Sequence, residues 1–289
     1  MNYRHQFHAG NFADVVKHAL LVALVRALQR KDKGCLLLDT HAGRGRYDLA
    51  AAAAGDSLAR RPEWPDGVGR LAGDAAGMEP LADYLGLVRD FDRGQGNLAP
   101  EPRFYPGSPG LLRALLRPAD RLVLVERHPA ECDALRAFAA GWPRTEVREG
   151  DGYALLRALL PPPERRGLIL LDPPFEAPEE FAWLAAAVGE GLRRFPTGVF
   201  AAWYPLTQRA RVDEFLHAVS ALAPPPCLTA ELTVAGESAG LKLRGCGLLV
   251  LNPPWGFAAV AQTLLDLLAP RLAQAPGGEA RLTWLVPDR

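Results

Sequence analysis

From residue 108 onward, short apolar runs alternate with longer segments of helical periodicity, and this alternation constrains the fold more than any other feature of the sequence. The apolar runs have the length of single strands and are rich in Leu and Val, which is typical of strands buried on both faces. Strands are predicted at 121–126, 145–149, 167–172 and 197–204. Helices are predicted at 109–117, 129–140, 152–160, 178–195 and 207–222. This order predicts an α/β fold in which helices cover both faces of a parallel sheet.

Further elements are predicted toward the two ends of the chain. Near the N-terminus, Asn11 can cap a helix with Asp14 at its third position, and Leu residues follow at helical spacing up to the charged KDKG segment. The buried strand CLLLD (35–39) comes next. Strands are also expected near 227–235 and 245–252, and a last helix and the strand ARLTWLV close the chain.

Residues 48–104 have a different character, because they are polar and rich in Gly and Ala, with short helical patterns and no clear strand. A stretch of this kind after the first strand of an alternating pattern indicates an insertion. We therefore expect residues 1–47 and 105–289 to form one Rossmann-like domain, with residues 48–104 as a small inserted helical subdomain.

Composition limits the classes of partner and compartment. The formal net charge is zero, so any surface for nucleic acid must be a local patch. The four cysteines are far apart and form no C-x-x-C pair, which argues against a disulfide framework or a zinc site and indicates a reducing compartment. The N-terminal segment lacks the apolar core of a signal peptide, and no run reaches the ~18 apolar residues of a membrane span. We therefore expect a cytoplasmic protein that binds no metal and no membrane.

Acidic residues end several of the predicted strands. Asp39 opens the turn D-T-H-A-G-R-G, Glu126 ends the next strand, and the pair Asp151-Gly152 follows the third. In an open α/β sheet, ligands bind in the crevice at the carboxyl ends of the strands. Gly43 permits a tight turn that a ligand can approach closely. Glu126 is placed to accept both ribose hydroxyls of a nucleoside, and Asp151 to accept from an adenine amino group.

Two nucleoside cofactors suit this arrangement. NAD-binding turns read G-x-G-x-x-G and place an acidic residue about 20 residues further on. Here the third glycine is absent and Glu126 lies beyond the insertion. The series of strand-end acids, with D-P-P-F after the fourth strand, favours S-adenosylmethionine instead.

The D-P-P-F motif (172–175) indicates the type of reaction. An exocyclic amine of adenine is a poor nucleophile, because its lone pair is delocalised into the ring. Asp172 and the carbonyl of Pro173 can accept hydrogen bonds from the two amino protons. Phe175 can stack on a base taken out of its helix, which stabilises binding by roughly 1–3 kcal/mol.

A second motif of the same form, N-P-P-W (252–255), follows a late strand. If that strand runs antiparallel to the others, Asn252 lies at the opposite edge of the sheet, away from the cofactor. We therefore assign the chemistry to Asp172. Trp255 is then expected to pack on the fold.

Taken together, six segments of the chain resemble the RlmJ family of bacterial 23S ribosomal RNA adenine-N6 methyltransferases. The segments are YRHQFHAGNFADVVKH, LLLDTHAGRGRY, YPGSP, LILLDPPFE, WYP and VLNPPW. The resemblance implies a class I S-adenosylmethionine-dependent methyltransferase with a mostly parallel seven-stranded sheet and a helical subdomain. It also implies methylation of one adenine of 23S rRNA, either free or in an assembly intermediate of the large ribosomal subunit, by a protein that we expect to be a monomer.

The resemblance also assigns roles to single residues. Asp172 takes the place of the catalytic acceptor, and Tyr3 falls where the family touches substrate RNA. Phe175 stands where Tyr is also common, so stacking is kept and any hydroxyl contact is lost. The cofactor contacts implied by the matching motifs are Lys17, His18, His41, Ser108, Glu126, Asp151 and Gly152.

Simpler interpretations of the same residues stay open. Ser108 before Pro109 is an ordinary helix start, and Lys17 with His18 could lie on a solvated helix face. His41 could merely bond the backbone of its turn. Two other functions also stay open: the same chemistry on DNA adenine or a protein amide, and a non-catalytic RNA-binding protein with a relic cofactor site.

A neutral protein that holds RNA needs clustered cations. Tyr3 beside Arg4 combines a ring with a charge, which suits an unpaired or flipped base. We expect the N-terminal segment and the insertion to flank the mouth of the site and grip the RNA. The cations proposed for this grip are Arg4, Lys17, Arg44, Arg46, Arg60, Arg61 and Arg70.

Overall fold

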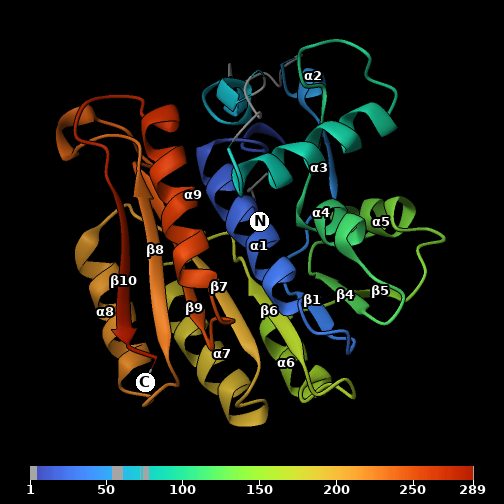
Figure 1. Cartoon of the computed structure of the whole chain (residues 1–289), viewed down its shortest axis with the longest axis vertical. Helices are drawn as coiled ribbons and strands as arrows, with labels where there is room; N and C mark the ends of the chain where they lie inside the picture. The colour runs from blue at the N-terminus through green and yellow to red at the C-terminus, as the bar shows by residue number, and fades with distance from the viewer. Residues whose placement is uncertain (1–4, 54–60, 72, 74–77, 289) are drawn as a thin grey trace.

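A computed structural model describes residues 5–53, 61–71, 73 and 78–288. The strands of its main sheet are β1 (Leu36–Asp39), β4 (Arg121–Glu126), β5 (Thr145–Glu149), β6 (Gly167–Leu171), β7 (Val199–Pro205), β8 (Cys227–Thr233), β9 (Gly245–Leu251) and β10 (Ala280–Val286). Their order is β10-β8-β9-β7-β6-β1-β4-β5 (Figure 1). Neighbours from β5 to β7 are parallel, β9 is antiparallel to β7 and β8, and β10 is antiparallel to β8.

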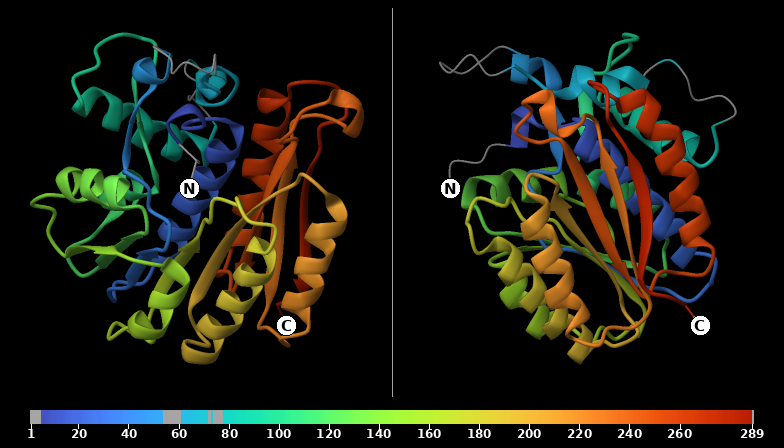
Figure 2. Two further views of the ribbon diagram at one scale, coloured as in Figure 1. Left: turned by 180° about the vertical axis from the view of Figure 1, so that it is seen from behind. Right: turned by 90° about the vertical axis from the view of Figure 1, so that its left-hand side faces the viewer.

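Helices cover both faces of this sheet, as the alternating pattern predicts. They are α1 (Phe12–Leu28), α4 (Ser108–Leu115), α5 (Pro129–Phe138), α6 (Gly152–Leu159), α7 (Glu180–Arg194), α8 (Arg209–Ser220) and α9 (Phe257–Leu272). Leu37 of β1 belongs to the core formed with α1, α4 and α9, whereas Leu36 and Leu38 belong to the core formed with α6, α7 and α8. Figure 2 shows these two layers from the side. No helix in the described ranges is long and apolar enough to cross a membrane.

The predicted Rossmann-like α/β fold is confirmed, but the expected number of strands, seven, is wrong, because the sheet has eight. The additional strand is β10, which pairs along the outer edge of β8. Leu282 packs against one core of the sheet, and Leu285 and Val286 pack against the other. Burial on both faces holds this last segment in the sheet.

Residues 48–104, which were expected to form an inserted subdomain, are mostly helical where the structure describes them. They contain α2 (Leu49–Ala53), η2 (Trp64–Asp66), η3 (Val68–Leu71) and α3 (Leu81–Gly94). At their two ends, β2 (Arg46–Asp48) and β3 (Phe104–Pro106) pair antiparallel. The buried Tyr84 of α3 bonds the hydroxyl of Tyr105 at 2.9 Å, which ties the inserted helix to β3.

The turn after β9 lies at the amino-terminal edge of the parallel strands, as predicted for Asn252. Leu251 pairs with Phe200 near the start of β7, so the two ends meet there. The Asn252 amide donates to the carbonyls of Pro196 and Gly198, both at 2.8 Å, and its φ is 52°. The Asn252 side chain therefore stabilises the segment just before β7 through these two hydrogen bonds. The expectation that Trp255 packs on the fold is wrong, because 86% of this residue is exposed.

We expect Asn252→Ala to lower the free energy of unfolding by about 2–3 kcal/mol, because it removes two hydrogen bonds and places alanine at positive φ. Turnover per folded molecule should not change. Asn252→Gly is the matched control, since glycine accepts this φ and should recover part of the loss. Urea unfolding and activity assays check both variants, and a folded but inactive Asn252→Ala would contradict the assignment of chemistry to Asp172.

Candidate active site

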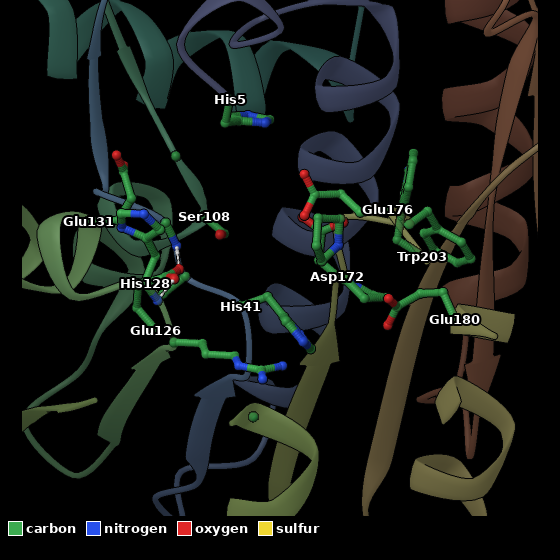
Figure 3. A pocket seen from close by; sticks show the side chains of 18 of the residues that line it. His5, His41, Ser108, Glu126, His128, Glu131, Asp172, Glu176, Glu180 and Trp203 are labelled. Atoms are coloured by element: carbon green, nitrogen blue, oxygen red, sulfur yellow. Dashed lines mark hydrogen bonds between the residues drawn. The ribbon is translucent and has the colours of Figure 1, made fainter. Parts of the chain in front are cut away.

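A cavity of about 1860 Å³ opens at the carboxyl ends of the parallel strands, where the sequence places the acidic residues (Figure 3). Glu126 and His128 lie on one side of it, Asp172 and Trp203 on the other, and His41 between them. Every predicted site residue that the structure describes lines this cavity: Lys17, His18, His41, Gly43, Ser108, Glu126, Asp151, Gly152, Asp172, Pro173 and Phe175. Tyr3 and Arg4 lie outside the described residues.

Glu126 at the end of β4 is fixed by the backbone. Its Oε2 accepts from the N–H of Gly43 at 2.8 Å, and its Oε1 accepts from the N–H of His128 at 2.6 Å. Gly43 has φ +60°, and a Cβ there would lie 2.5 Å from the Tyr47 hydroxyl. Glycine is therefore required for the turn to reach the carboxylate. Each carboxylate oxygen keeps a second lone pair that can accept another hydrogen bond, and Glu126 lines the cavity.

Asp151 caps the helix that follows it. Its Oδ1 accepts from the N–H groups of Tyr153 and Ala154 at 2.9 and 3.1 Å, while its Oδ2 lies 3.5 Å from Arg127. A Cβ on Gly152 would lie 2.1 Å from the carbonyl oxygen of Thr40, so glycine lets α6 begin against the turn after β1. One oxygen of Asp151 thus caps α6, and the other forms an ion pair with Arg127.

A buried chain of charges ends at Asp172. The Lys17 Nζ donates to Asp172 Oδ2 at 2.6 Å and to Asp14 Oδ1 at 2.8 Å. His5 contacts the other oxygen of Asp14 at 2.9 Å. Burial opposes ionisation of Asp14 and Lys17, but the attraction of each to the opposite charges of its neighbours outweighs it. The pKa of Asp14 therefore lies well below its usual value, and the pKa of Lys17 lies well above its usual value. Lys17 is therefore a cation held against Asp172.

His18 and His41 are neutral at physiological pH. Burial, with the charge of Lys17, lowers the pKa of His18 to about 3, and desolvation lowers that of His41 to about 4. His18 Nδ1 contacts the Tyr105 hydroxyl at 2.8 Å, and its Nε2 has no partner among the described residues. The simpler interpretation of Lys17 and His18 as a solvated face is wrong, since their exposed fractions are 5% and 1%.

The low pKa of His18 has a consequence for stability. Below pH 6.5, the ordinary pKa of histidine, His18 takes up a proton in the unfolded chain but stays neutral in the folded chain. Protonation therefore favours the unfolded chain, and the free energy of unfolding falls as the pH decreases from 6.5 toward 3. We expect the parent to lose about 1.4 kcal/mol per pH unit relative to His18→Asn below about pH 6.5. Urea unfolding at pH 7, 6 and 5 measures the difference, and parallel pH profiles would contradict a neutral buried His18.

Two aromatic rings flank Asp172. Phe175 has φ 49° and meets Phe181 and Trp203 edge-on, with ring centroids 4.8 and 5.7 Å apart. Phe175 and Trp203 both line the cavity, so they form an apolar wall beside the carboxylate. Trp203 lies within the WYP segment, and no role was predicted for it. Its position directly at the end of a predicted strand was the available signal.

Other residues of the site had weaker signals or none. Asp14 was expected only as part of a helix start, and His5 was only part of the N-terminal segment that resembles the family. The hydroxyl of Tyr153 in α6 donates to Glu180 in α7 at 2.8 Å. No sequence pattern predicted this pair. The described residues contain no cluster of three His, Cys, Asp or Glu side chains arranged for a metal.

Several of the cations proposed to grip RNA form contacts within the protein. Lys17 is buried in its ion pairs, and Arg44 donates two hydrogen bonds to Glu131 at 2.7 and 2.6 Å. The expectation that Lys17 binds phosphate is therefore wrong, whereas Arg44, which lines the cavity and is partly exposed, stays a candidate. Arg46 and Arg61 are exposed, although Arg46 donates to Gln95 at 2.9 Å. Arg70 pairs with Asp66, and Arg60 lies outside the described residues.

Known proteins are similar to this chain in sequence and in structure. The family model "RsmJ: Ribosomal RNA large subunit methyltransferase D, RlmJ" matches residues 32–286. Ribosomal RNA large subunit methyltransferase J of Escherichia coli K12 is 38% identical over 288 residues, and its namesake from Haemophilus influenzae is 34% identical; each match covers 100% of both chains. The crystal structure of protein LPL1258 from Legionella pneumophila is similar with a TM-score of 0.84 and 34% identity, covering 96% of this chain and 98% of that one.

Proposed function

The chain belongs to the RlmJ family of ribosomal RNA large subunit methyltransferases, and we propose that it transfers a methyl group from S-adenosylmethionine to the exocyclic N6 of one adenine in 23S rRNA. The observation that carries this proposal is the position of Asp172. It follows the central strand β6, is held by Lys17, and shares one cavity with the backbone-fixed Glu126.

The residues of the cavity fit S-adenosylmethionine, which when bound supplies an electrophilic methyl group on sulfur. Glu126 would accept the ribose hydroxyls, and the second oxygen of Asp151 would accept from the adenine amino group. His18 Nε2, buried and without a partner among the described residues, offers a polar contact, and His41 and Ser108 line the same space. Gly43 and Gly152 allow the backbone to lie close to the ligand.

Asp172 and Pro173 would orient the target amine. Lys17 engages Asp172 Oδ2, which leaves Oδ1 available to accept one amino proton, while the Pro173 carbonyl accepts the other. Both bonds draw the protons away from the nitrogen and direct its lone pair out of the base plane toward the methyl group. Positioning of this kind accounts for much of the expected rate enhancement.

Phe175 and Trp203 would hold the target base. Aromatic rings that line a pocket beside a carboxylate can stack on a base that has left its helix. The edge-on contacts of Phe175 with Phe181 and Trp203 fix its ring before the base arrives. The wall therefore favours a flat substrate over a flexible amide side chain.

The remaining parts of the proposal concern the partner. The substrate is 23S rRNA or an assembly intermediate of the large ribosomal subunit, met in the cytoplasm. Tyr3 and Arg4, just before His5, would contact this RNA, and residues 48–104 would act as a subdomain beside the cavity. These assignments rest on the sequence motifs.

A single assay separates this function from its alternatives. Labelled S-adenosylmethionine is offered with unmodified 23S rRNA, with adenine-containing DNA and with total protein from a strain that lacks the enzyme. We expect label in 23S rRNA at a stoichiometry near one methyl group per molecule. Label confined to DNA or protein would replace this function with the corresponding alternative, and binding of rRNA without transfer to any substrate would indicate a non-catalytic RNA-binding protein.

A further inference from the structure

The second Pro-Pro turn, 252–255, has no part in the proposed reaction, yet it carries a conspicuous aromatic side chain. Trp255 is 86% exposed, compared with 47% for Trp183 and 36% for Trp284, the other exposed tryptophans among the described residues. An indole ring of this size costs free energy when it is left in water. Its exposure leaves the ring available to a partner.

The turn is built to project this ring. The N–H of Phe257 donates to the carbonyl of Pro254 at 2.9 Å, and Gly256 has φ +79°, so Trp255 stands at the corner of a tight turn. Arg30 donates to the Trp255 carbonyl at 3.2 Å, and its Cζ lies 5.7 Å from the ring centroid. One face of the indole is therefore near a cation and the other is open.

The loop that supplies Arg30 is basic and well anchored. Arg30, Lys31 and Lys33 are exposed, and Asp32 is the acid among them. Arg117 donates to the carbonyls of Gln29 and Lys31 at 3.0 Å each, and Arg166 donates to those of Leu28, at 2.6 Å, and Lys33. The charge of Arg117 is balanced by Asp120, whereas Arg166 adds to the positive charge of the loop.

We propose that Trp255, Arg30, Lys31 and Lys33, together called the far-edge surface, form a second contact for the substrate RNA. The occupant is an unpaired nucleotide whose base stacks on Trp255 and whose phosphates meet the three cations. An exposed flat ring beside clustered cations is the combination that single-stranded RNA recognises. The inference rests on the proposed function, which supplies RNA as the partner.

The position of this surface sets the required length of the RNA. β9 runs antiparallel to β7, so its end lies at the amino-terminal edge of the parallel strands, opposite the edge at which the cavity opens. At about 3.3 Å per strand residue, the strands and their turns separate the two sites by roughly 20 Å. A short oligonucleotide in the cavity cannot reach the far-edge surface. Its contribution should therefore appear only with long RNA.

The test measures binding of two probes to the full chain across a salt series: intact 23S rRNA and a short adenine-containing oligoribonucleotide. We expect Trp255→Ala to weaken binding of 23S rRNA about tenfold, corresponding to the loss of one stacked base. Binding of the oligonucleotide and of S-adenosylmethionine should not change. Trp255→Phe should restore most of the affinity, and Trp284→Ala is the matched control for loss of an exposed indole.

A double variant tests the cations. Lys31→Ala with Lys33→Ala should reduce the slope of log affinity against log salt by about 1–2 for 23S rRNA, since fewer counterions are released.

If Trp255→Ala binds 23S rRNA like the parent while the parent methylates it, the far-edge surface is refuted and the proposed function stands. Equal weakening for both probes would also refute it, because the ring would then act through the fold. A parent that neither binds nor methylates 23S rRNA would overturn both proposals.

Discussion

Replacing Asp172 with alanine is expected to lower the rate of methyl transfer by about a thousandfold or more. The substitution removes the carboxylate proposed to accept an amino proton and to direct the nitrogen toward the methyl group. S-adenosylmethionine affinity should stay within a few-fold, because the residues proposed to hold the cofactor, such as Glu126, are fixed by backbone bonds that do not involve Asp172.

Calorimetry with S-adenosylmethionine and single-turnover rates measure the two quantities separately. Asp172→Asn serves as the conservative control, since it keeps the shape and one acceptor oxygen but loses the charge that pairs with Lys17. It should retain more activity than the alanine variant. Loss of cofactor binding together with activity would show that Asp172 holds the cofactor and not the amine.

Replacing Lys17 with methionine is expected to reduce both stability and rate. Methionine keeps much of the side-chain volume but leaves the buried Asp14 with His5 as its remaining side-chain partner, and the loss of a buried ion-pair partner costs about 3–5 kcal/mol. Asp172 also loses the donor that fixes Oδ2, so the carboxylate can turn away from the amine. We expect turnover per folded molecule to fall by about a hundredfold.

Asp14→Asn is the matched control for this result. It weakens the same ion-pair network but leaves the bond between Lys17 and Asp172 in place. It should therefore lose stability while keeping most of its turnover per folded molecule. If Lys17→Met and Asp14→Asn lose turnover equally, Lys17 acts through the stability of α1 and does not position Asp172.

Much of the fold could be predicted because each strand is marked by a short apolar run in its own sequence. Runs such as RLVLVE, between helical patterns, mark β4 without knowledge of its neighbours, and the acids at the strand ends meet because parallel strands share one edge. The same reasoning placed Glu126, Asp151 and Asp172, which line the cavity. Lys17, His18, His41 and Ser108 also line it, but they were predicted only from the family resemblance. The eighth strand was visible in ARLTWLV, but its pairing with β8 is a long-range choice that the pattern does not state.

The interactions that the sequence concealed join residues far apart in the chain. Lys17 and Asp172 are 155 positions apart, and nothing near either residue marks the pair. The ion pair of Arg44 could not be predicted either, because its partner Glu131 lies 87 residues further on. Trp255 was expected to pack because apolar residues usually do, whereas the tight turn at Gly256 projects it into solvent.

The most direct test of the proposed reaction is to identify the modified nucleoside. Unmodified 23S rRNA is incubated with S-adenosylmethionine and the parent protein, digested to nucleosides and analysed by mass spectrometry against synthetic standards. The proposed role of Asp172 predicts N6-methyladenosine at about one per rRNA molecule with the parent and none above background with Asp172→Ala. A methyl group on another atom or base, or equal yields from the parent and Asp172→Ala, would contradict it.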